Sequence, residues 1–546
     1  MKILTSEQIR EIDAQTVLRE RISSLDLMER AATAFYHWLI EKYDREDISI
    51  LVFAGVGNNG GDALAVARML HGAGYPVKVV VVEYSASYSN DCLHNLRRAM
   101  AAGISCTKIV SASDIPQSNF FQGGLPQGGS PLNDSHKPNT GPSVPELGLS
   151  DLSPFDEYDL LIDGLFGTGF NREVSGLARE VIARMNESGK RIVSIDVPSG
   201  LFLDRKTAFA VEASETVTFQ IPKLALYLPG NQHFCGEVWH VEIGLSETAI
   251  AEADSDTFFT RGEEARGWLK LLPRFAHKGT LGHALVIGGS LGMMGSVCLA
   301  AKAALRSGCG LVTAYLPHSG VPIIQGYFPE AMAVGDAHGS RITAIEYNLK
   351  PNAIGIGIGM GQHHDTTQAL YRFLKKIHGL ENSVPLVVDA DGLNILSKHP
   401  GWLSLLPPGT VLTPHPKELS RLIGEWSDDF DKIQKTRAFA REYGVIVVVK
   451  GAFSLVIDAE TIHVNSSGTP ALATAGSGDV LTGMITGLLA QGYPPLDAAR
   501  LGVYLHGLTA NLATGRMHER AFIASDIIDG IGSAYAFLEN VHPEVF

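Results

Sequence analysis

Two short segments that combine glycine with aspartate constrain the fold most strongly. Residues 58–62 read Asn-Asn-Gly-Gly-Asp, and residues 476–479 read Gly-Ser-Gly-Asp. Each follows a stretch typical of a strand and opens a stretch typical of a helix. A glycine-rich turn at a helix start brings backbone amides and the positive end of the helix dipole close to an anion. We therefore predict two anion-binding sites, in which each aspartate binds a cation or transfers a proton.

Length and charge limit the class of protein. A chain of 546 residues is too long for one core, and we expect two domains. The net charge of -14 argues against a nucleic-acid or membrane-surface binder, which leaves small anionic molecules as partners. The five cysteines are scattered and never spaced as Cys-x-x-Cys, and no export or membrane-spanning segment is evident. A cytoplasmic location is expected.

The N-terminal half has the pattern of a parallel α/β sheet. Apolar runs of strand length alternate with helical patterns, as in βαβ units. Strands are predicted at residues 48–53, 77–82, 160–162 and 191–196. Residues 123–150 are rich in Gly, Pro and Ser and predict a mobile surface loop, with a lid or a docking segment as the alternative.

A second α/β series begins at His283, after a predicted helix or linker at residues 246–256. Helical patterns, notably at 294–306 and 479–489, separate most of its strands. Strands are predicted at 284–287, 311–315, 353–358, 385–388, 410–412 and 445–449. We expect α/β architecture with two three-layer αβα domains. The two glycine-aspartate turns differ in length and context, which favours a fusion of unlike domains.

The second turn has the features of a phosphoryl-transfer centre. Its successive amides suit the charge on transferred oxygens, and Asp479 is the candidate general base; alternatively, Asp479 only caps the helix. Three more segments follow predicted strands, with a lysine suited to phosphates and a glutamate, Glu418, able to hold a metal directly or through water. They are Gly357-x-Gly359-x-Gly361, Thr-Pro-His-Pro-Lys-Glu at 413–418 and Lys-Gly-Ala-Phe-Ser at 450–454.

These motifs resemble those of the ADP- or ATP-dependent NAD(P)H-hydrate dehydratases of the ribokinase-like superfamily. The similarity covers residues 265–535 and includes Lys-Gly-x-x-Gly-His at 278–283, Val-Ile-Gly-Gly-Ser at 286–290 and Val-Asp-Ala-Asp-Gly-Leu-Asn at 388–394. It implies a ribokinase-like fold, ADP or ATP as co-substrate, and Mg²⁺. Hydrate contacts are implied at Gly361, His415 and Asp479. Nucleotide contacts are implied at Lys450, Gly451, Ala452, Phe453, Ser454 and Gly478.

The implied chemistry starts with removal of the C6 hydroxyl proton of the hydrated nicotinamide ring by Asp479. The hydroxyl then takes a phosphoryl group, and phosphate leaves to regenerate NADH or NADPH. His415 has a structural alternative as a hydrogen-bonded loop histidine, and Asp389 and Asp391 either bind metal or ligand or act as caps. A rival function is that of a vitamin or sugar kinase, which would leave phosphate on its product. Two-domain fusions resemble bacterial versions, which implies a preference for ADP.

The first turn lacks the Gly-x-Gly-x-x-Gly spacing of a dinucleotide fingerprint. Asp163 and Asp196 also follow predicted strands, so we expect them to meet Asn58 at one edge of the sheet. Asn, Asp and Ser oxygens suit a hard, weakly bound cation, and the remaining acid is free for proton transfer. The alternative is that each aspartate is only a turn or cap residue.

These segments are similar to the NAD(P)H-hydrate epimerase family, from about residue 4 to 244 apart from the insertion. The resemblance implies a Rossmann-like epimerase fold and a K⁺ site at Asn59, Asp163 and Ser199. Asp196 is implied as the acid or base that inverts C6, and Lys223 is its helper, a phosphate contact or a surface residue. Hydrate binding is implied at Asn58, Asn59, Gly60, Gly61, Asp62, Gly167, Thr168, Gly169, Phe170, Asn171, Arg172, Glu173 and Asp196.

Together the resemblances imply repair of hydrated NAD(P)H. Hydration yields two C6 epimers, so a dehydratase specific for the S form needs a partner that interconverts them. We expect an epimerase domain at residues 1–245, with a disordered insertion at 123–150, a dehydratase domain at 255–546, and a homo-oligomer. The alternative for the first half is a binding scaffold; such scaffolds can lose their acids, whereas Asp62, Asp163 and Asp196 are all present.

Overall fold

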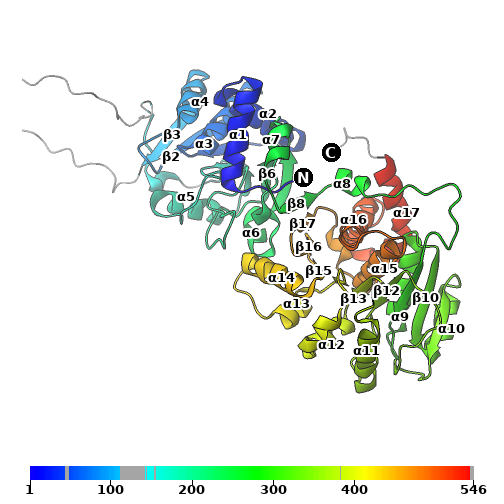
Figure 1. Ribbon diagram of the computed structural model, residues 1–546. Coiled ribbons are helices and arrows are strands. Elements are labelled where there is room, and N and C mark those ends of the chain that lie inside the picture. The colour runs from blue at the N-terminus through cyan, green and yellow to red at the C-terminus, as the bar shows by residue number, and fades with distance from the viewer. Residues whose placement is uncertain (44–47, 111–141, 143, 153–154, 381–382, 541–546) are drawn as a thin grey trace, which may run out of the picture. The chain divides into compact units, whose positions relative to one another are not determined.

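The computed structural model describes residues 1–43, 48–110, 142, 144–152, 155–380 and 383–540. The chain forms two compact units, Ile3–Asp254 and Ser255–Phe546, and the second also includes Met1–Lys2 (Figure 1). The Met1 ammonium group donates to the Phe259 carbonyl oxygen (2.9 Å) and pairs with Glu264. The predicted linker contains helix α7 (Glu247–Glu252), which belongs to the first unit.

The first unit contains a wholly parallel seven-stranded sheet in the order β3-β2-β1-β4-β5-β6-β7. Its register aligns Phe53 with Asp163, and Asp163 with Ser194, so the carboxyl ends of β1, β4 and β5 share one edge. The strands are β1 (Ile50–Ala54), β2 (Val77–Glu83), β3 (Ser105–Val110), β4 (Leu160–Gly164), β5 (Arg191–Ile195), β6 (Glu215–Phe219) and β7 (Glu237–Val241).

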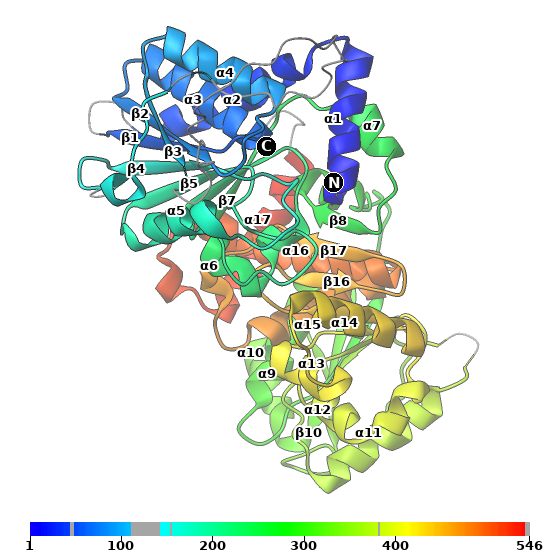
Figure 2. The same cartoon turned by 90° about the vertical axis from the view of Figure 1, so that its left-hand side faces the viewer.

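Alternation along β1 supplies two cores. Ile50, Val52 and Ala54 face one core, and Leu51 and Phe53 face the other, because successive strand residues point to opposite faces. Residues of α5 (Gly176–Glu187) fill the second core, and the remaining long helices cover the first (Figure 2). Those helices are α1 (Ser6–Glu20), α2 (Ser24–Lys42), α3 (Asn58–Gly72) and α4 (Asn90–Ala101). The shorter elements are η1 (Leu149–Leu152), η2 (Leu224–Tyr227), η3 (Pro229–Asn231) and α6 (Gln232–Cys235).

The second unit contains a mixed ten-stranded sheet in the order β11-β10-β9-β12-β13-β14-β15-β16-β17-β8. Strand β16 is antiparallel to β15 and to β17, and the other neighbours are parallel. The strands are β8 (Thr257–Thr260), β9 (His283–Ile287), β10 (Leu311–Pro317), β11 (Met332–Asp336), β12 (Ala353–Ile356), β13 (Leu386–Val388), β14 (Val411–Leu412), β15 (Ile446–Val449), β16 (Leu455–Ile457) and β17 (Ile462–Asn465).

Helices lie on both faces of this sheet (Figure 1). On one face, α9 (Met294–Arg306), α15 (Ser477–Ala490), α16 (Pro495–Ala513) and α17 (Ala524–Asn540) pack into a single core. On the other lie α11 (His364–Ile377), α12 (Asp391–Lys398), α13 (Pro416–Ile423) and α14 (Asp429–Tyr443). The shorter elements are α8 (Gly262–Gly267), η4 (His318–Gly320), α10 (Val321–Tyr327), η5 (Pro400–Leu405), η6 (Pro470–Leu472) and η7 (Glu519–Ala521).

The expected α/β architecture with two three-layer domains is confirmed, and two local expectations change. Residues 123–141 and 143 of the predicted mobile loop lie outside the described residues. Residues 144–150 instead run alongside β3. The Lys108 amide donates to the Pro145 carbonyl oxygen (2.9 Å), and the Leu147 amide donates to the Lys108 carbonyl oxygen (2.8 Å). The second glycine-aspartate turn follows 3-10 helix η6 rather than a strand, since β17 ends at Asn465.

Candidate active sites

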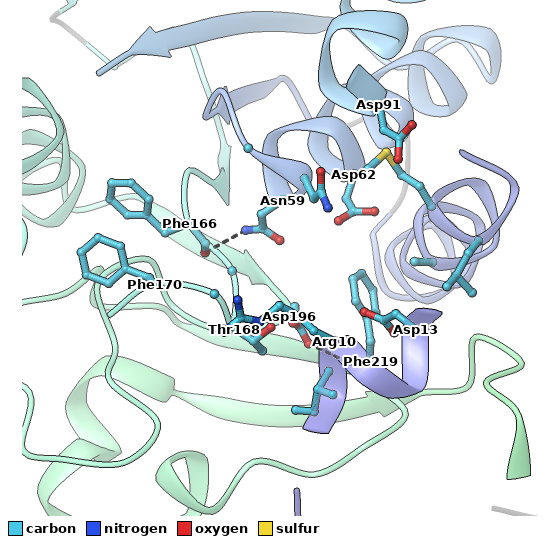
Figure 3. Close-up of a pocket in the computed structure, with 18 of the residues that line it drawn as sticks. Arg10, Asp13, Asn59, Asp62, Asp91, Phe166, Thr168, Phe170, Asp196 and Phe219 are labelled. Atoms are coloured by element: carbon cyan, nitrogen blue, oxygen red, sulfur yellow. Dashed lines mark hydrogen bonds between the residues drawn. The ribbon is translucent and has the colours of Figure 1, made fainter. Parts of the chain in front are cut away.

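A cavity of about 810 Å³ lies at the carboxyl edge of the first sheet (Figure 3). The loop after β4 supplies Gly167, Thr168, Gly169, Phe170, Asn171 and Arg172, and the first turn of α3 supplies Asn58, Asn59 and Asp62. Asp196 and Lys223 complete the predicted set. Gly60, Gly61 and Glu173 are not among the lining residues. Gly60 instead allows two backbone segments to approach closely, because a Cβ there would lie 1.9 Å from the Gly55 carbonyl oxygen.

Asp163, near the end of β4, is fully buried and is not among the residues that line the cavity. Its Oδ1 accepts hydrogen bonds from Ser199 Oγ (2.5 Å) and the Leu165 amide (3.2 Å), and its Oδ2 accepts from Ser194 Oγ and the Ser199 amide (both 2.8 Å). Burial raises the pKa of Asp163, although these hydrogen bonds oppose the shift. The carboxylate is therefore held by four hydrogen-bond donors.

Asn59 completes this group from the helix side. Its Nδ2 donates to the Phe166 carbonyl oxygen (2.9 Å), which also accepts from Ser199 Oγ (3.3 Å). Within the described part of the chain, Asn59 Oδ1 is buried and has no hydrogen-bond partner. An orphaned buried oxygen beside a buried acid is a chemically suitable position for a cation. The three predicted metal ligands, Asn59, Asp163 and Ser199, thus form one connected cluster.

Asp196 has a left-handed backbone (φ 66°), which is uncommon for a residue other than glycine. Its Oδ1 accepts hydrogen bonds from Lys223 Nζ (2.6 Å), the Phe219 amide (3.1 Å) and Thr218 Oγ1 (3.3 Å). The same Nζ donates to Thr218 Oγ1 and to the Phe219 carbonyl oxygen, both at 2.9 Å. Because Lys223 is only 2% exposed, the alternative that it is a surface residue is wrong.

The cavity contains acids that the sequence motifs did not identify. Asp13 of α1 and Asp91 of α4 line it together with Asp62 and Asp196 (Figure 3). Burial, reinforced by Asp196 and opposed by Lys223, raises the pKa of Asp13 to about 7. Burial also raises the pKa of Asp62 well above its usual range, and nearby carboxylates, including Asp196 and Asp13, add to the shift. Ile9, Ile12 and Thr16 of α1 are buried. The sequence signal that could have identified Asp13 was therefore its position as an acid beside the buried face of a helix.

In the second unit, the turn at residues 476–479 opens α15. Gly476 is the N-cap in a left-handed conformation (φ 85°), and Asp479 is the third residue of the helix, so the alternative of Asp479 as the N-cap is wrong. Burial, reinforced by Asp389 and opposed by Ser296 and Lys450, raises the pKa of Asp479 to about 6. This value suits a group that accepts a proton at neutral pH.

Lys450 connects the turn to the strand ends. Its Nζ donates to Asp389 Oδ1 (2.9 Å), and Thr482 Oγ1 of α15 donates to Asp389 Oδ2 (2.7 Å). A Cβ on Gly478 would lie 3.3 Å from this Nζ, so the lysine is next to the turn. Residues 450–454 join the antiparallel strands β15 and β16, and Ser454 Oγ closes the loop by donating to the Gly451 carbonyl oxygen (3.2 Å). Burial raises the pKa values of Glu418 and Asp479, and the charge of Lys450 partly opposes both shifts.

The remaining predicted residues border the same place. His415 is the N-cap of α13, and its Nδ1 accepts from the Lys417 and Glu418 amides (3.1 and 3.4 Å), so its structural role is present. Its side chain remains 47% exposed and available to a ligand. The Gly361 amide donates to Asp391 Oδ2 (2.8 Å). Neither Asp389 nor Asp391 is the N-cap of α12, which is Ala390, so the cap alternative is wrong.

His506 of α16 is a neighbour of the turn that the motifs did not reveal. Its Nε2 lies 3.0 Å from the Ser477 carbonyl oxygen and 3.2 Å from Ser477 Oγ. Burial, opposed by the hydrogen bond to the Ser477 carbonyl and reinforced by Lys450, lowers the pKa of His506 to about 4, so the imidazole is neutral at pH 7. A neutral ring that donates Nε2–H to a carbonyl oxygen holds the first residue of α15 in place.

Two family models match the chain. Residues 24–225 match that of the YjeF-related protein N-terminus, and residues 284–531 match NAD(P)H-hydrate dehydratase. A crystal structure of the ADP/ATP-dependent NAD(P)H-hydrate dehydratase of Bacillus subtilis, co-crystallised with ATP and Mg²⁺, is 29% identical with a TM-score of 0.44, and the match covers 52% of this chain and 98% of that one.

The chain is 31% identical to the bifunctional NAD(P)H-hydrate repair enzyme Nnr of Moorella thermoacetica, over 100% of this chain and 98% of the relative. It is 34% identical to that of Coxiella burnetii, over 96% and 97%. The chain belongs to the bifunctional NAD(P)H-hydrate repair enzyme family. The two family models fall in separate structural units, residues 24–225 in the first and 284–531 in the second.

In the described ranges of this repair enzyme, His, Cys, Asp and Glu side chains nowhere gather in threes as a metal-binding group. A cation held by amide, hydroxyl and carbonyl oxygens with one carboxylate is consistent with that finding. Of the described helices, none combines the length and the apolar character that crossing a bilayer requires.

Proposed function

We propose that this protein repairs hydrated NADH and NADPH in two steps. The unit Ile3–Asp254 interconverts the R and S forms at C6, and the unit Ser255–Phe546 dehydrates the S form with ADP or ATP and releases phosphate. The observation that carries the proposal is the full-length match to bifunctional relatives. In this chain, each of the two family models matches a separate structural unit, and each unit has its own candidate site. Each site pairs a lysine with a buried carboxylate and has a second acid of raised pKa.

In the dehydratase unit, Asp479 removes the C6 hydroxyl proton while the oxygen attacks the terminal phosphoryl group of the nucleotide. The amides of the turn and Lys450 stabilise the charge on the transferred oxygens. The ring nitrogen's electron pair then expels phosphate from C6, and loss of a C5 proton restores the dihydronicotinamide ring. Gly361 and His415 are proposed hydrate contacts, and Gly451, Ala452, Phe453, Ser454 and Gly478 are proposed nucleotide contacts.

Mg²⁺ fits the dehydratase unit at Glu418, directly or through water, because both Asp389 oxygens accept hydrogen bonds, whereas among the described residues Glu418 accepts one only at Oε2, from the His415 amide (2.9 Å). Glu418 is only 5% exposed, and burial raises the pKa of its carboxyl group. When bound, Mg²⁺ would neutralise charge on the nucleotide phosphates. In the epimerase unit, K⁺ fits at Asn59, Asp163 and Ser199. There it would be coordinated by Asn59 Oδ1, which has no hydrogen-bond partner among the described residues, and would offset the charge of the buried Asp163 carboxylate.

In the epimerase unit, Asp196 is the proposed acid or base, and Lys223 neutralises it and holds it in its left-handed conformation. The hydrate is proposed to contact residues 58–62, the loop from Gly167 to Glu173, and Asp196. The acids present here disfavour the scaffold alternative, because a binding surface does not require four carboxylates around one cavity.

The test uses hydrated NADH of each configuration and the full chain. With ADP or ATP, absorbance of NADH should recover from the S form, and from the R form only through epimerisation. Inorganic phosphate should appear in equal amount, whereas a vitamin or sugar kinase would keep the phosphate on its product. Asp196→Ala should abolish use of the R form and preserve that of the S form. Absence of recovery with both nucleotides would refute the dehydratase assignment.

Two further properties are part of the proposal. All five cysteines are buried free thiols, which is compatible with a reducing cytoplasm. We also propose a homo-oligomer, and sedimentation equilibrium of the full chain tests it, with a monomer mass as the contrary result. The nucleotide preference follows from the same recovery assay, with ADP as the expected better co-substrate.

A further inference from the structure

Asp13 stands out among the residues that line the epimerase cavity, because no motif accounts for it. It lies in the middle of α1, four residues after Ile9 and three before Thr16, which are both buried. The spacing directs Asp13 to the side of the helix that meets the cavity, where Ile9, Arg10, Ala14 and Val17 also line it. Figure 3 shows Asp13 and Asp196 on the same side of the cavity.

Helix α1 holds this acid in a defined position. The Thr5 side chain caps its start. Gln8 Nε2 donates to the Asp254 carbonyl oxygen (2.6 Å), Thr16 Oγ1 accepts from the Ser246 amide (3.0 Å), and Arg19 donates to Thr248 Oγ1 (2.7 Å). These bonds span most of the helix, so Asp13 sits on a rigid element rather than on a free end.

The charges around Asp13 do not balance without a proton. Asp196 has Lys223 as a hydrogen-bonded cation, whereas, within the described residues, neither Asp13 nor Asp62 has a hydrogen-bond partner for its carboxyl group. The groups that face Asp13 are Asp196 and Lys223, with Asp62 of α3 and Arg10 of α1 also on the cavity wall and Asp91 of α4 near Asp62. Two unpaired acids beside one lysine–carboxylate pair cannot both stay ionised in a buried site.

We infer that Asp13 is a catalytic residue of epimerisation, which exchanges a proton with the hydrate as the partner of Asp196. The inference deepens the proposed epimerase function and rests on it. The pKa of about 7 supports the role, because a group that gives and regains a proton works best near the ambient pH. The pKa of Asp62 is also raised, by burial and by the neighbouring carboxylates.

Inversion by ring opening requires two proton transfers, one at the C6 hydroxyl and one at N1, and each acid carries out one of them. Asp196 takes the C6 hydroxyl proton as the C6–N1 bond breaks, and C6 becomes an aldehyde carbon. The electron pair of that bond passes to N1, which takes the proton from Asp13. Rotation about C5–C6 presents the other face of the aldehyde, N1 attacks it and returns its proton to Asp13, and the oxygen recovers its proton from Asp196. Both acids end as they began.

The experiment compares Asp13→Asn with Glu11→Gln in the full chain. Asparagine keeps the shape but cannot carry a proton, and Glu11 is an exposed acid two residues away on the same helix. Interconversion of the R and S hydrates is followed by chromatography without nucleotide. Asp13→Asn should slow interconversion about 10²-fold or more, and Glu11→Gln should not. Dehydration of the S form should be equal in both variants.

The pH profile separates proton transfer from a structural role. Wild-type interconversion should lose rate as pH rises through about 7, because Asp13 loses its proton there. The variant Asp13→Glu should restore part of the rate with a displaced profile, whereas Asp13→Asn should show no such limb. Wild-type rate and pH profile in Asp13→Asn would overturn the inference. If the wild type itself fails to interconvert the hydrates, the proposed function fails instead.

Discussion

The Asp479→Asn variant tests the dehydratase site most directly. Because the pKa of Asp479 is about 6, about nine tenths of this group is ionised at pH 7 and about one tenth at pH 5. The wild-type rate at a saturating concentration of S hydrate should therefore rise about tenfold between pH 5 and 7. Asparagine cannot accept the hydroxyl proton, so the variant should lose about 10²- to 10⁴-fold in kcat, or ~3–5 kcal/mol of transition-state stabilisation.

The assay follows NADH absorbance with S hydrate and ADP across this pH range. Asp529→Asn, an exposed acid on α17, is the matched control and should behave as wild type. Interconversion of the epimers by Asp479→Asn should be normal, because that cavity lies in the other unit. A variant with more than one tenth of wild-type kcat, or a wild-type rate that is flat from pH 5 to 7, would refute the assignment of Asp479 as base.

The same substitution has a predicted sign for stability. The folded-state pKa of Asp479 is raised above its ordinary value of 3.8, so the native state binds the proton more strongly than the unfolded chain does. Stability from this group is therefore present below pH 4 and lost as pH rises through about 6. Asp479→Asn should melt at a higher temperature than wild type at pH 7.5, and the difference should shrink at pH 4.5. A variant that melts lower at pH 7.5 would contradict the burial argument.

Three further predictions concern the neighbours of the two sites. Replacement of K⁺ by tetramethylammonium should slow epimerisation but not dehydration of the S form, since the orphaned Asn59 Oδ1 belongs to the first unit; equal loss of both activities would contradict this site. His506→Ala should lower kcat for dehydration about 10²-fold because the Ser477 carbonyl oxygen loses its donor, and His506→Gln should recover much of it; no difference between the two would argue against positioning. Lys223→Met should destabilise the first unit by about 3–5 kcal/mol in urea unfolding, because it leaves Asp196 buried and unpaired, and adding Asp196→Asn should restore part of the loss.

The strands that position both sites could be predicted from the sequence because they are buried and parallel. Strand β1 is apolar throughout; Asp163 lies near the carboxyl end of its neighbour β4, and Asp196 follows the next strand, β5, as expected for such a sheet. Short strands such as β8, β16 and β17 carry no comparable run and were missed. Strand β8 was also hidden by distance, since it pairs with β17 some 200 residues later.

The sites were only partly accessible for a related reason. Asn59 and Gly478 each belong to a short motif, residues 58–62 and 476–479, so their proximity to the other residues of the same motif was evident. Asp13 and His506 reach the sites from helices that no motif marks, and only the packing of those helices reveals them. The left-handed backbone of Asp196 was equally hidden, because the donors to its side chain, Phe219 and Lys223, lie 23 and 27 residues later in the sequence.

Both units solve one electrostatic problem in the same way. A lysine is held by one carboxylate, Lys223 by Asp196 at 2.6 Å and Lys450 by Asp389 at 2.9 Å, and a second acid nearby keeps a raised pKa. The lysine therefore cannot fully ionise the second acid, which stays ready to exchange protons near neutral pH. With pKa values of about 7 for Asp13 and about 6 for Asp479, the proposed epimerase acid loses its proton at a higher pH than the one at which the proposed dehydratase base becomes ionised. Between pH 6 and 7 both proposed groups are substantially in their active states, so conversion of the R hydrate to NADH by the full chain should be fastest there. A single activity that stays constant from pH 5 to 9 would show that the corresponding acid does not limit its reaction.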